Sequence, residues 1–323
     1  MRFWKKPFVY AAVYTAALLC FTAYVLLDTF VIARPGSPVK ADHSFPPEIT
    51  DGSGVSEETA GETTAAQYTQ ATASGGGVQF SDTSYADGNI TISIEKIKNN
   101  DTYIYIADVE AKSAEYLRTL LARDTFGTNI TETTSDMSER AGAILAINGD
   151  YYGANKRGYV IKNGVLYRDT IRGDTAYDDL VVYADGSFGF VNEKEVSAQQ
   201  LIADGVRQLF AFGPVLVRDG EIAVDSNDEV GKSMSSNPRT ALGVINALHY
   251  VFVVSDGRTA ESEGLSLYEL AEVMTGYGCT AAYNLDGGGS STMVFNGRLI
   301  NNPTTNGRTI TERKVSDIVY IGY

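Results

Sequence analysis

The chain has 323 residues, and its 26 Lys and Arg against 40 Asp and Glu give a formal net charge of -14. Without a concentrated basic patch, this balance argues against a nucleic-acid-binding surface. Two His and two Cys residues are too few for a multi-His metal site or a disulfide framework.

Residues 1–33 have the pattern of a membrane anchor. Arg2, Lys5 and Lys6 precede an apolar run over residues 8–33, which is long enough to cross a bilayer. The basic flank should stay cytoplasmic, which places the rest of the chain outside. The alternative is a cleaved signal peptide, but its apolar region is usually about 7–15 residues long. We therefore predict an uncleaved, single-pass anchor in the cell membrane, with Cys20 inside it and Cys279 without a disulfide partner.

Residues 34–87 have a different composition. This stretch is rich in Ser, Thr, Glu and Gly and includes Gly75-Gly76-Gly77. Such a composition buries too little apolar surface to offset its ordering entropy. It predicts a flexible acidic linker that contains His43. Part of it could still pack on the folded unit, because Val78-Gln79-Phe80 suits a short edge strand.

Residues 88–323 form the predicted folded unit. Alternating apolar and polar residues, divided by Asn-Gly and Asp-Gly turns, are typical of strands joined by hairpins. We expect strands over residues 90–97, 103–109, 143–147, 159–167, 180–191, 211–218, 240–245, 249–254, 281–285, 293–295 and 318–322. Helical spacing occurs at residues 198–205 and 265–277, and more weakly at 113–123. The sequence therefore predicts one α+β domain around a mixed, largely antiparallel β-sheet with a few helices.

The most unusual stretch is Asn284-Leu285-Asp286-Gly287-Gly288-Gly289-Ser290-Ser291. An apolar strand delivers Asp286 to its end, and three glycines then allow backbone amides to approach an anionic ligand. The spacing matches neither a P-loop nor a dinucleotide-binding fingerprint. A plain glycine-rich turn, capped by Asp286, is the competing interpretation.

A second polar cluster, Asn148-Gly149-Asp150-Tyr151-Tyr152, also follows an apolar strand. An Asn-Gly turn with Asp150 bonded to its own backbone is the simpler interpretation. Smaller charged groups lie later in the chain: Arg239, Asp256, Arg258, Arg308, Glu312 and Arg313. Because Asp150, Asp256 and Asp286 each follow a strand, one sheet edge could bring them together.

In combination and in order, these motifs resemble the phosphodiester glycosidase family. The resemblance rests on six segments within residues 143–323: Ile147-Asn148-Gly149-Asp150-Tyr151-Tyr152, Phe212-Gly213-Pro214, Asn237-Pro238-Arg239-Thr240-Ala241, Asp256-Gly257-Arg258, the glycine-rich stretch at Asp286, and Glu312-Arg313. The anchor and linker are more similar to those of exported bacterial members, which are often described as exopolysaccharide-related. The resemblance implies hydrolysis of a sugar-1-phosphodiester at the anomeric C–O bond.

The resemblance also implies roles for individual residues. Asp286 is the first choice for the carboxylate that acts at the sugar, with Asp150 and Glu312 as competitors. Asn148 and Tyr152 would orient sugar hydroxyls. The phosphate would be held by a set of basic and backbone groups near the substrate, namely Arg239, the amides of Gly287, Gly288 and Gly289, Ser290 and Arg313, with Asp256 and Arg258 also at the binding site.

Other functions stay open at this stage. Asp150, Asp256 and Asp286 are hard oxygen ligands that suit Ca²⁺ or Mg²⁺, although we expect an enzyme without a metal or other cofactor. The alternatives are a glycan-binding or exopolysaccharide-assembly surface protein, and a metal-dependent phosphodiesterase that cuts the P–O bond. The expected partner is a phosphorylated glycan or cell-wall polymer outside the cell, with the membrane contacted through the N-terminal helix and no nucleic acid bound.

Overall fold

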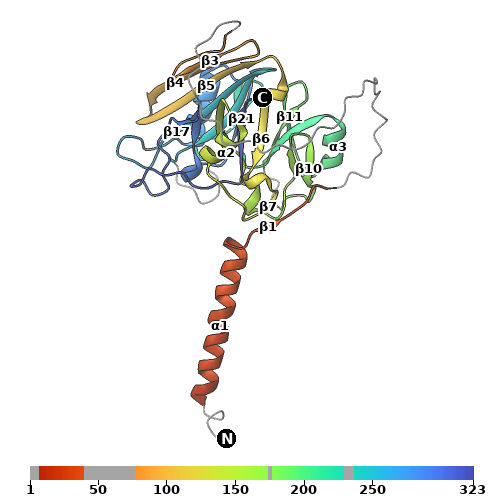
Figure 1. Cartoon of the computed structure of the whole chain (residues 1–323), viewed down its shortest axis with the longest axis vertical. Helices are drawn as coiled ribbons and strands as arrows, with labels where there is room; N and C mark the ends of the chain where they lie inside the picture. The colour runs from red at the N-terminus through yellow and green to blue at the C-terminus, as the bar shows by residue number, and fades with distance from the viewer. Residues whose placement is uncertain (1–6, 40–76, 174–176, 229–235) are drawn as a thin grey trace, which may run out of the picture.

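The computed structural model describes residues 7–39, 77–173, 177–228 and 236–323. Helix α1 (Pro7–Phe30) projects away from a folded domain that contains the rest of these residues (Figure 1). Its segment Val9–Phe30 has a mean hydropathy of 1.8, and none of it is buried. By length and composition the helix is able to cross a membrane, as the sequence predicts.

Two antiparallel sheets form the centre of the domain. The larger has the order β15 (Glu221–Ile222), β14 (Val215–Arg218), β18 (Ala281–Asn284), β16 (Thr240–Asn246), β17 (His249–Ser255), β5 (Thr102–Ala111), β4 (Ile90–Asn99), β3 (Ser84–Ala86) and β2 (Gln79–Phe80). The smaller has the order β20 (Arg298–Leu299), β19 (Met293–Phe295), β8 (Leu145–Asn148), β21 (Asp317–Ile321) and β6 (Leu117–Leu121). The α+β class is confirmed, with several sheets in place of one.

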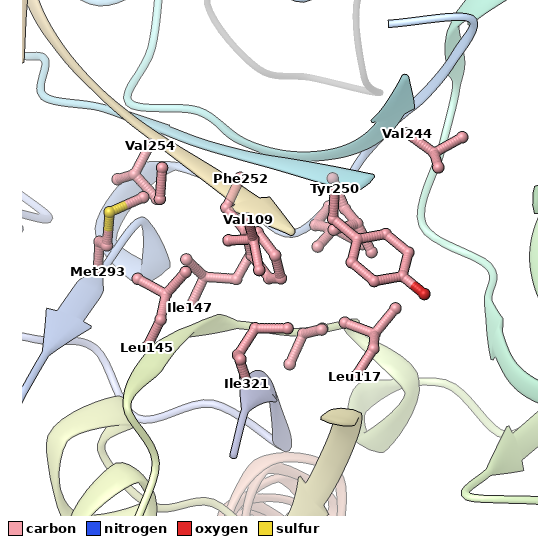
Figure 2. Close-up of a cluster of buried hydrophobic side chains, with 14 of the residues drawn as sticks. Val109, Leu117, Leu145, Ile147, Val244, Tyr250, Phe252, Val254, Met293 and Ile321 are labelled. Atoms are coloured by element: carbon pink, nitrogen blue, oxygen red, sulfur yellow. The ribbon is translucent and has the colours of Figure 1, made fainter. Parts of the chain in front are cut away.

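The two sheets pack face to face over the main hydrophobic core. Phe252 and Val254 from the larger sheet meet Leu145, Ile147 and Met293 from the smaller one (Figure 2). Helix α4 (Leu267–Gly276) covers the outer face of the larger sheet, and α2 (Thr134–Ala141) packs against the smaller sheet. The result is a layered order of helix, sheet, sheet and helix. The ends of the central strands are therefore held by packing on both sides.

A smaller lobe extends the domain. It contains the sheet β12 (Phe188–Val191), β11 (Asp179–Tyr183) and β13 (Val206–Phe210), the hairpin β9 (Val160–Lys162) and β10 (Val165–Arg168), and helix α3 (Ala198–Ala203). Its own apolar cluster includes Ile161, Val181 and Leu209. Asn163 and Asp185 each precede a glycine with positive φ, so the predicted hairpin turns are present.

Three features differ from the sequence-based expectations. The folded unit begins before residue 88, because β2 and β3 add to the larger sheet, and the suggested edge strand at Gln79 is confirmed. The weak helical pattern at residues 113–123 is wrong: Leu117, Thr119 and Leu121 alternate inward and form β6. Helix α2 was missed because Met137 is its only strongly apolar buried residue. Residues 40–76, with His43, lie outside the described part of the chain.

The stretch after α1 also packs on the domain. Arg34 and Pro35 form β1 (Arg34–Pro35), which pairs with β7 (Gly127–Thr128), and the Val39 amide donates to the Leu166 carbonyl at 2.8 Å. Residues 34–39 were expected to be part of a free linker. Backbone hydrogen bonds hold these residues on the domain instead, and such bonds depend little on which side chains are present.

Candidate active site

The segments that follow β8 and β18 meet at one end of the two packed sheets. The Asp286 amide lies 3.4 Å from the Gly149 carbonyl, and the Thr240 hydroxyl donates to Asn148 Oδ1 at 2.8 Å. β16 begins at Thr240 and β17 ends at Ser255, so both contribute to the same end of the sandwich. These strand ends therefore share one edge that is built from both sheets, but among the described residues Asp150, Asp256 and Asp286 do not form a cluster there.

Asn148 connects the segments that meet at this edge. Its side chain is fully buried, and its Nδ2 donates to the Asp286 carbonyl at 2.6 Å. Its Oδ1 also accepts from the Thr292 amide at 3.2 Å. These contacts occupy the groups that were expected to orient sugar hydroxyls. In this geometry Asn148 fixes the backbone at Asp286.

Asp286 lies in a compact network with Ser290 and Arg313. The Arg313 guanidinium donates to both carboxylate oxygens at 3.1 and 3.2 Å, and the Ser290 hydroxyl donates to Asp286 Oδ2 at 2.7 Å. Arg313 Nε donates to Ser290 Oγ at 2.8 Å. Burial raises the pKa of Asp286, while Arg313 and Ser290 act in the opposite direction. A buried carboxyl with a raised pKa and a fixed orientation is suited to proton transfer or nucleophilic attack.

The three glycines after Asp286 allow neighbouring segments to approach closely. A Cβ on Gly288, whose φ is +62°, would lie 2.9 Å from Arg258 Nη2, and one on Gly289 would lie 2.1 Å from Thr305 Oγ1. The Gly288 amide donates to the Pro238 carbonyl at 2.8 Å. The glycines therefore bring Arg258 against the loop, and the Gly288 amide is already engaged within the protein.

Three arginines converge beside this loop. The Arg258 guanidinium donates to Asn237 Oδ1 at 2.8 Å and to the Thr305 carbonyl at 2.8 Å. Burial lowers the pKa of Arg258, and the charges of Arg313 and Arg239 lower it further. Arg239 is buried, and its Nε donates to the Leu265 carbonyl at 2.9 Å. Three mutually repelling cations at one strand end favour the binding of an anion such as a phosphate.

Asp150 lines a cavity of about 240 Å³ on the other side of Gly149. Its carboxylate is buried and accepts hydrogen bonds from the amides of Tyr151 and Ala211, both at 2.7 Å. Tyr152 is also buried in this wall, and its hydroxyl lies 3.4 Å from the Ser316 carbonyl. Ten residues line the cavity: Asp150, Tyr151, Tyr152, Asn155, Arg157, Arg168, Arg172, Tyr177, Ala211 and Phe212.

Buried charged residues hold the Asp150 backbone, and no local sequence motif identifies them. Asp317 Oδ1 accepts from the Asp150 amide at 2.8 Å, and its Oδ2 lies 2.8 Å from Lys162 Nζ. Burial raises the pKa of Asp317 to about 6, although Lys162 opposes the shift. Lys162 comes from a hairpin and Asp317 from the last strand, so no local motif connects them. Their shared signal is a charged residue within an otherwise apolar strand.

A second buried pair borders the same cavity. Arg172 Nη2 donates to Asp179 Oδ1 at 2.6 Å, and the Arg172 Nη1 contacts the Ala211 carbonyl. Burial raises the pKa of Asp179 to about 9, and the nearby Glu193 carboxylate raises it as well. Arg168 donates to the carbonyls of Gly158 and Asn155, both at 2.6 Å. The cavity wall therefore has a dense set of fixed charges.

The remaining predicted residues have structural contacts. Asp256 Oδ1 accepts from the Asn302 amide at 2.7 Å, and its Oδ2 lies 3.2 Å from the Tyr105 hydroxyl. Glu312 Oε1 accepts from the Ser135 amide at 3.0 Å, at the start of α2. Among the described residues, no three His, Cys, Asp or Glu side chains are grouped so as to hold a metal ion. Metal independence itself stays a prediction.

Comparisons with known proteins identify a family and several relatives. The phosphodiester glycosidase family model matches residues 141–322. The SPbeta prophage-derived uncharacterized protein YomE of Bacillus subtilis (strain 168) is 34% identical over 201 residues, which are 61% of this chain and 31% of that protein. The N-acetylglucosamine-1-phosphodiester alpha-N-acetylglucosaminidase of Mus musculus is 30% identical over 187 residues, or 53% of this chain and 35% of that enzyme. The chain thus spans about a third of the length of these relatives.

A solved structure shows the same fold. The catalytic domain of the zebrafish N-acetylglucosamine-1-phosphodiester alpha-N-acetylglucosaminidase, auto-inhibited by its pro-peptide, superposes with a TM-score of 0.57. The match covers 72% of this chain and 83% of that one at 22% identity, so it supports the fold alone. The family match spans more than half of the chain and includes both Asp150 and Asp286. The chain belongs to the phosphodiester glycosidase family.

Proposed function

We propose that the protein hydrolyses a sugar-1-phosphodiester at the anomeric C–O bond, on the outer side of the membrane that holds α1. The observation that carries this proposal is the buried Asp286 carboxyl beside Arg239, Arg258 and Arg313. This arrangement pairs one carboxylate for the sugar with a cationic site for the departing phosphate. The substrate would be a phosphorylated glycan or an envelope polymer.

The proposed reaction needs no strong general acid. The bond between the anomeric carbon and the phosphate oxygen breaks, and the phosphate leaves with the bonding electrons as a monoester. A water oxygen ends on the anomeric carbon, and its proton is released to solvent. Asp286 either activates that water or attacks the carbon first. Asp150 is the second carboxylate at the site, held in orientation by the Tyr151 and Ala211 amides.

Isotope labelling and one substitution test this proposal. The full chain in detergent micelles is incubated in ¹⁸O water with the methyl diester of N-acetylglucosamine 1-phosphate, then with the corresponding diesters of other sugars. We expect label in the released sugar, and a fall in kcat of at least about 10³-fold in Asp286→Asn. Asp101→Asn is the matched control, because Asp101 is exposed in the β4–β5 turn and its positive φ suits Asn.

Other outcomes point to other functions. Label in the phosphate would indicate P–O cleavage and support a phosphodiesterase. Binding of the diesters without turnover by any variant would support a glycan-binding surface protein. Full activity in Asp286→Asn would remove Asp286 from its assigned role and make Asp150→Asn the next variant to measure.

A further inference from the structure

The end of the membrane helix is attached directly to the wall of the Asp150 cavity. Asn129 Nδ2 donates to the carbonyls of Thr29 and Ile32, both at 3.1 Å, where α1 ends. The Asn129 amide donates to the Gly153 carbonyl at 3.1 Å, next to Tyr152 in the cavity wall. One residue thus bridges the outer end of α1 and the cavity.

The chain that follows α1 strengthens this attachment. The Gly36 amide donates to the Phe126 carbonyl at 2.8 Å, and Gly36 packs so closely on Phe126 that a Cβ would lie 2.7 Å from the ring. Phe126 stacks on Tyr152 with 5.5 Å between ring centroids. Further along, Val39 is bonded to Leu166, two residues before the cavity residue Arg168. Residues 34–39 therefore contact Phe126 and Leu166, which are neighbours of the lining residues Tyr152 and Arg168.

The rim of the cavity has side chains that suit a lipid surface. Tyr151 and Tyr177 line the cavity and are 46% and 38% exposed, and Ile171, which precedes the lining residue Arg172, is 42% exposed. Lys156 and Arg157 are exposed beside them. Aromatic, apolar and basic side chains together are typical of protein surfaces at the membrane interface.

We infer that the cavity faces the membrane in which α1 is anchored, and that the substrate is a sugar-1-phosphodiester whose second ester group is a lipid alcohol embedded in that membrane. The inference rests on the proposed function for its chemistry, and the cavity adjoins Asp286 because the Asp286 amide lies 3.4 Å from the carbonyl of Gly149, which precedes Asp150. The attachment through Asn129 and β1 keeps the cavity at the lipid surface. A substrate confined to the same surface reaches a high effective concentration there, whereas a soluble glycan gains nothing from the anchor.

The first experiment measures where the cavity lies and needs no substrate. In full-length protein with Cys20→Ser, a bimane label is placed at Lys156→Cys on the rim or at Gly88→Cys. Gly88 lies in the connection between β3 and β4, and these two strands are at the end of the domain opposite α1 (Figure 1). The buried Cys279 should stay unlabelled. In vesicles with headgroup-nitroxide lipid, we expect quenching at Lys156→Cys to exceed that at Gly88→Cys several-fold. Equal or reversed quenching would overturn the inference.

The second experiment measures substrate preference in phosphatidylcholine vesicles. We compare the hexadecyl and methyl diesters of N-acetylglucosamine 1-phosphate and expect kcat/KM to favour the hexadecyl diester by at least about tenfold. A ten-residue Gly/Ser spacer between Ile32 and Ala33 lifts the domain by about 18 Å and should abolish this preference without changing methyl-diester hydrolysis. The same spacer after Gly61 leaves residues 7–39 unaltered and should keep the preference.

The outcomes separate the two proposals. Equal use of both diesters, or a preference that survives the Ile32 spacer, would overturn the lipid-linked substrate while the glycosidase activity stands. Hydrolysis of neither diester, nor of the corresponding diesters of other sugars, would count against the proposed function. The quenching comparison would still decide which face of the domain meets the membrane.

Discussion

The Asp286 carboxylate and the Arg313 guanidinium form a bonded ion pair 3.1 Å apart, within a region that excludes most solvent from the carboxyl. Arg313 itself is 41% exposed at its side chain. The pair therefore extends from the protein interior to the surface. This arrangement leaves one face of the arginine open to a ligand, while its other face opposes the rise that burial causes in the pKa of Asp286.

Replacing Arg313 should change the pH dependence of the reaction. Burial raises the pKa of Asp286 and Arg313 lowers it, so Arg313→Ala should raise that pKa further. Because the proposed mechanism needs ionised Asp286, the acidic limb of kcat/KM against pH should move to higher pH. Arg308→Ala is the control, since Arg308 is exposed. An unmoved limb in Arg313→Ala would mean that a different group controls it.

Replacing Arg258 should weaken the binding of phosphate. Its guanidinium lies against Gly288 and among the charges of Arg239 and Arg313, where an anion would relieve their repulsion. In Arg258→Ala we expect the inhibition constant for inorganic phosphate to rise by about tenfold or more. Arg218→Ala should leave this constant unchanged, because Arg218 stacks on Phe190 and pairs with Asp178 elsewhere. Equal effects of the two substitutions would contradict the phosphate site.

Removing Lys162 should destabilise the fold in a pH-dependent way. Asp317 is fully buried with a pKa raised to about 6, so its stabilising contribution is complete at low pH and is lost as the pH rises through that value. Lys162→Met raises this pKa further by removing the counter-ion. We expect a loss of about 3–5 kcal/mol in unfolding free energy at pH 8 and a smaller loss at pH 5.

Denaturant titrations at the two pH values measure these losses. The double variant Lys162→Met/Asp317→Asn carries no titrating carboxyl at this position. It should show nearly the same loss at pH 5 and pH 8. A loss for Lys162→Met that is independent of pH would show that the lysine acts through packing on Phe210, which its Nζ approaches at 4.2 Å from the ring centroid.

Two glycine substitutions should have opposite effects on thermal stability. Gly289→Ala places a Cβ 2.1 Å from Thr305 Oγ1 and 3.1 Å from its Cα, so the melting temperature should fall. Gly276→Ala, in the last turn of α4, meets nothing within 4 Å. It should add about 0.5–1 kcal/mol by reducing the entropy of the unfolded chain. A neutral Gly289→Ala would mean that the Thr305 segment moves freely.

The sequence predicts the site better where its signals are local. Asp286 and its glycines stand out because an apolar strand leads into them, and Asp150 follows the same pattern. The hairpins at Asn163 and Asp185 are likewise predicted by their Asn-Gly and Asp-Gly turns. The contacts of Asn148, in contrast, depend on the docking of two sheets. No local pattern shows that its side-chain amide is hydrogen-bonded to the Asp286 carbonyl and the Thr240 hydroxyl.

Burial decides the features that the sequence left unclear. The stretch around Leu117, Thr119 and Leu121 has apolar residues whose spacing fits either a helix or a strand. Only its pairing with β21 makes it a strand. Lys162 and Asp317 are both charged, which from sequence favours exposure. They are buried because they pair with each other across a long stretch of chain.

The bond between Asn148 and the Asp286 carbonyl joins residues that are 138 positions apart, and Arg313 lies further along the chain still. The site is therefore complete only when the chain has been synthesised as far as Arg313 and both sheets have docked. A chain that ends before Arg313 would keep the Asp286 motif but lack the ion pair that fixes its carboxylate.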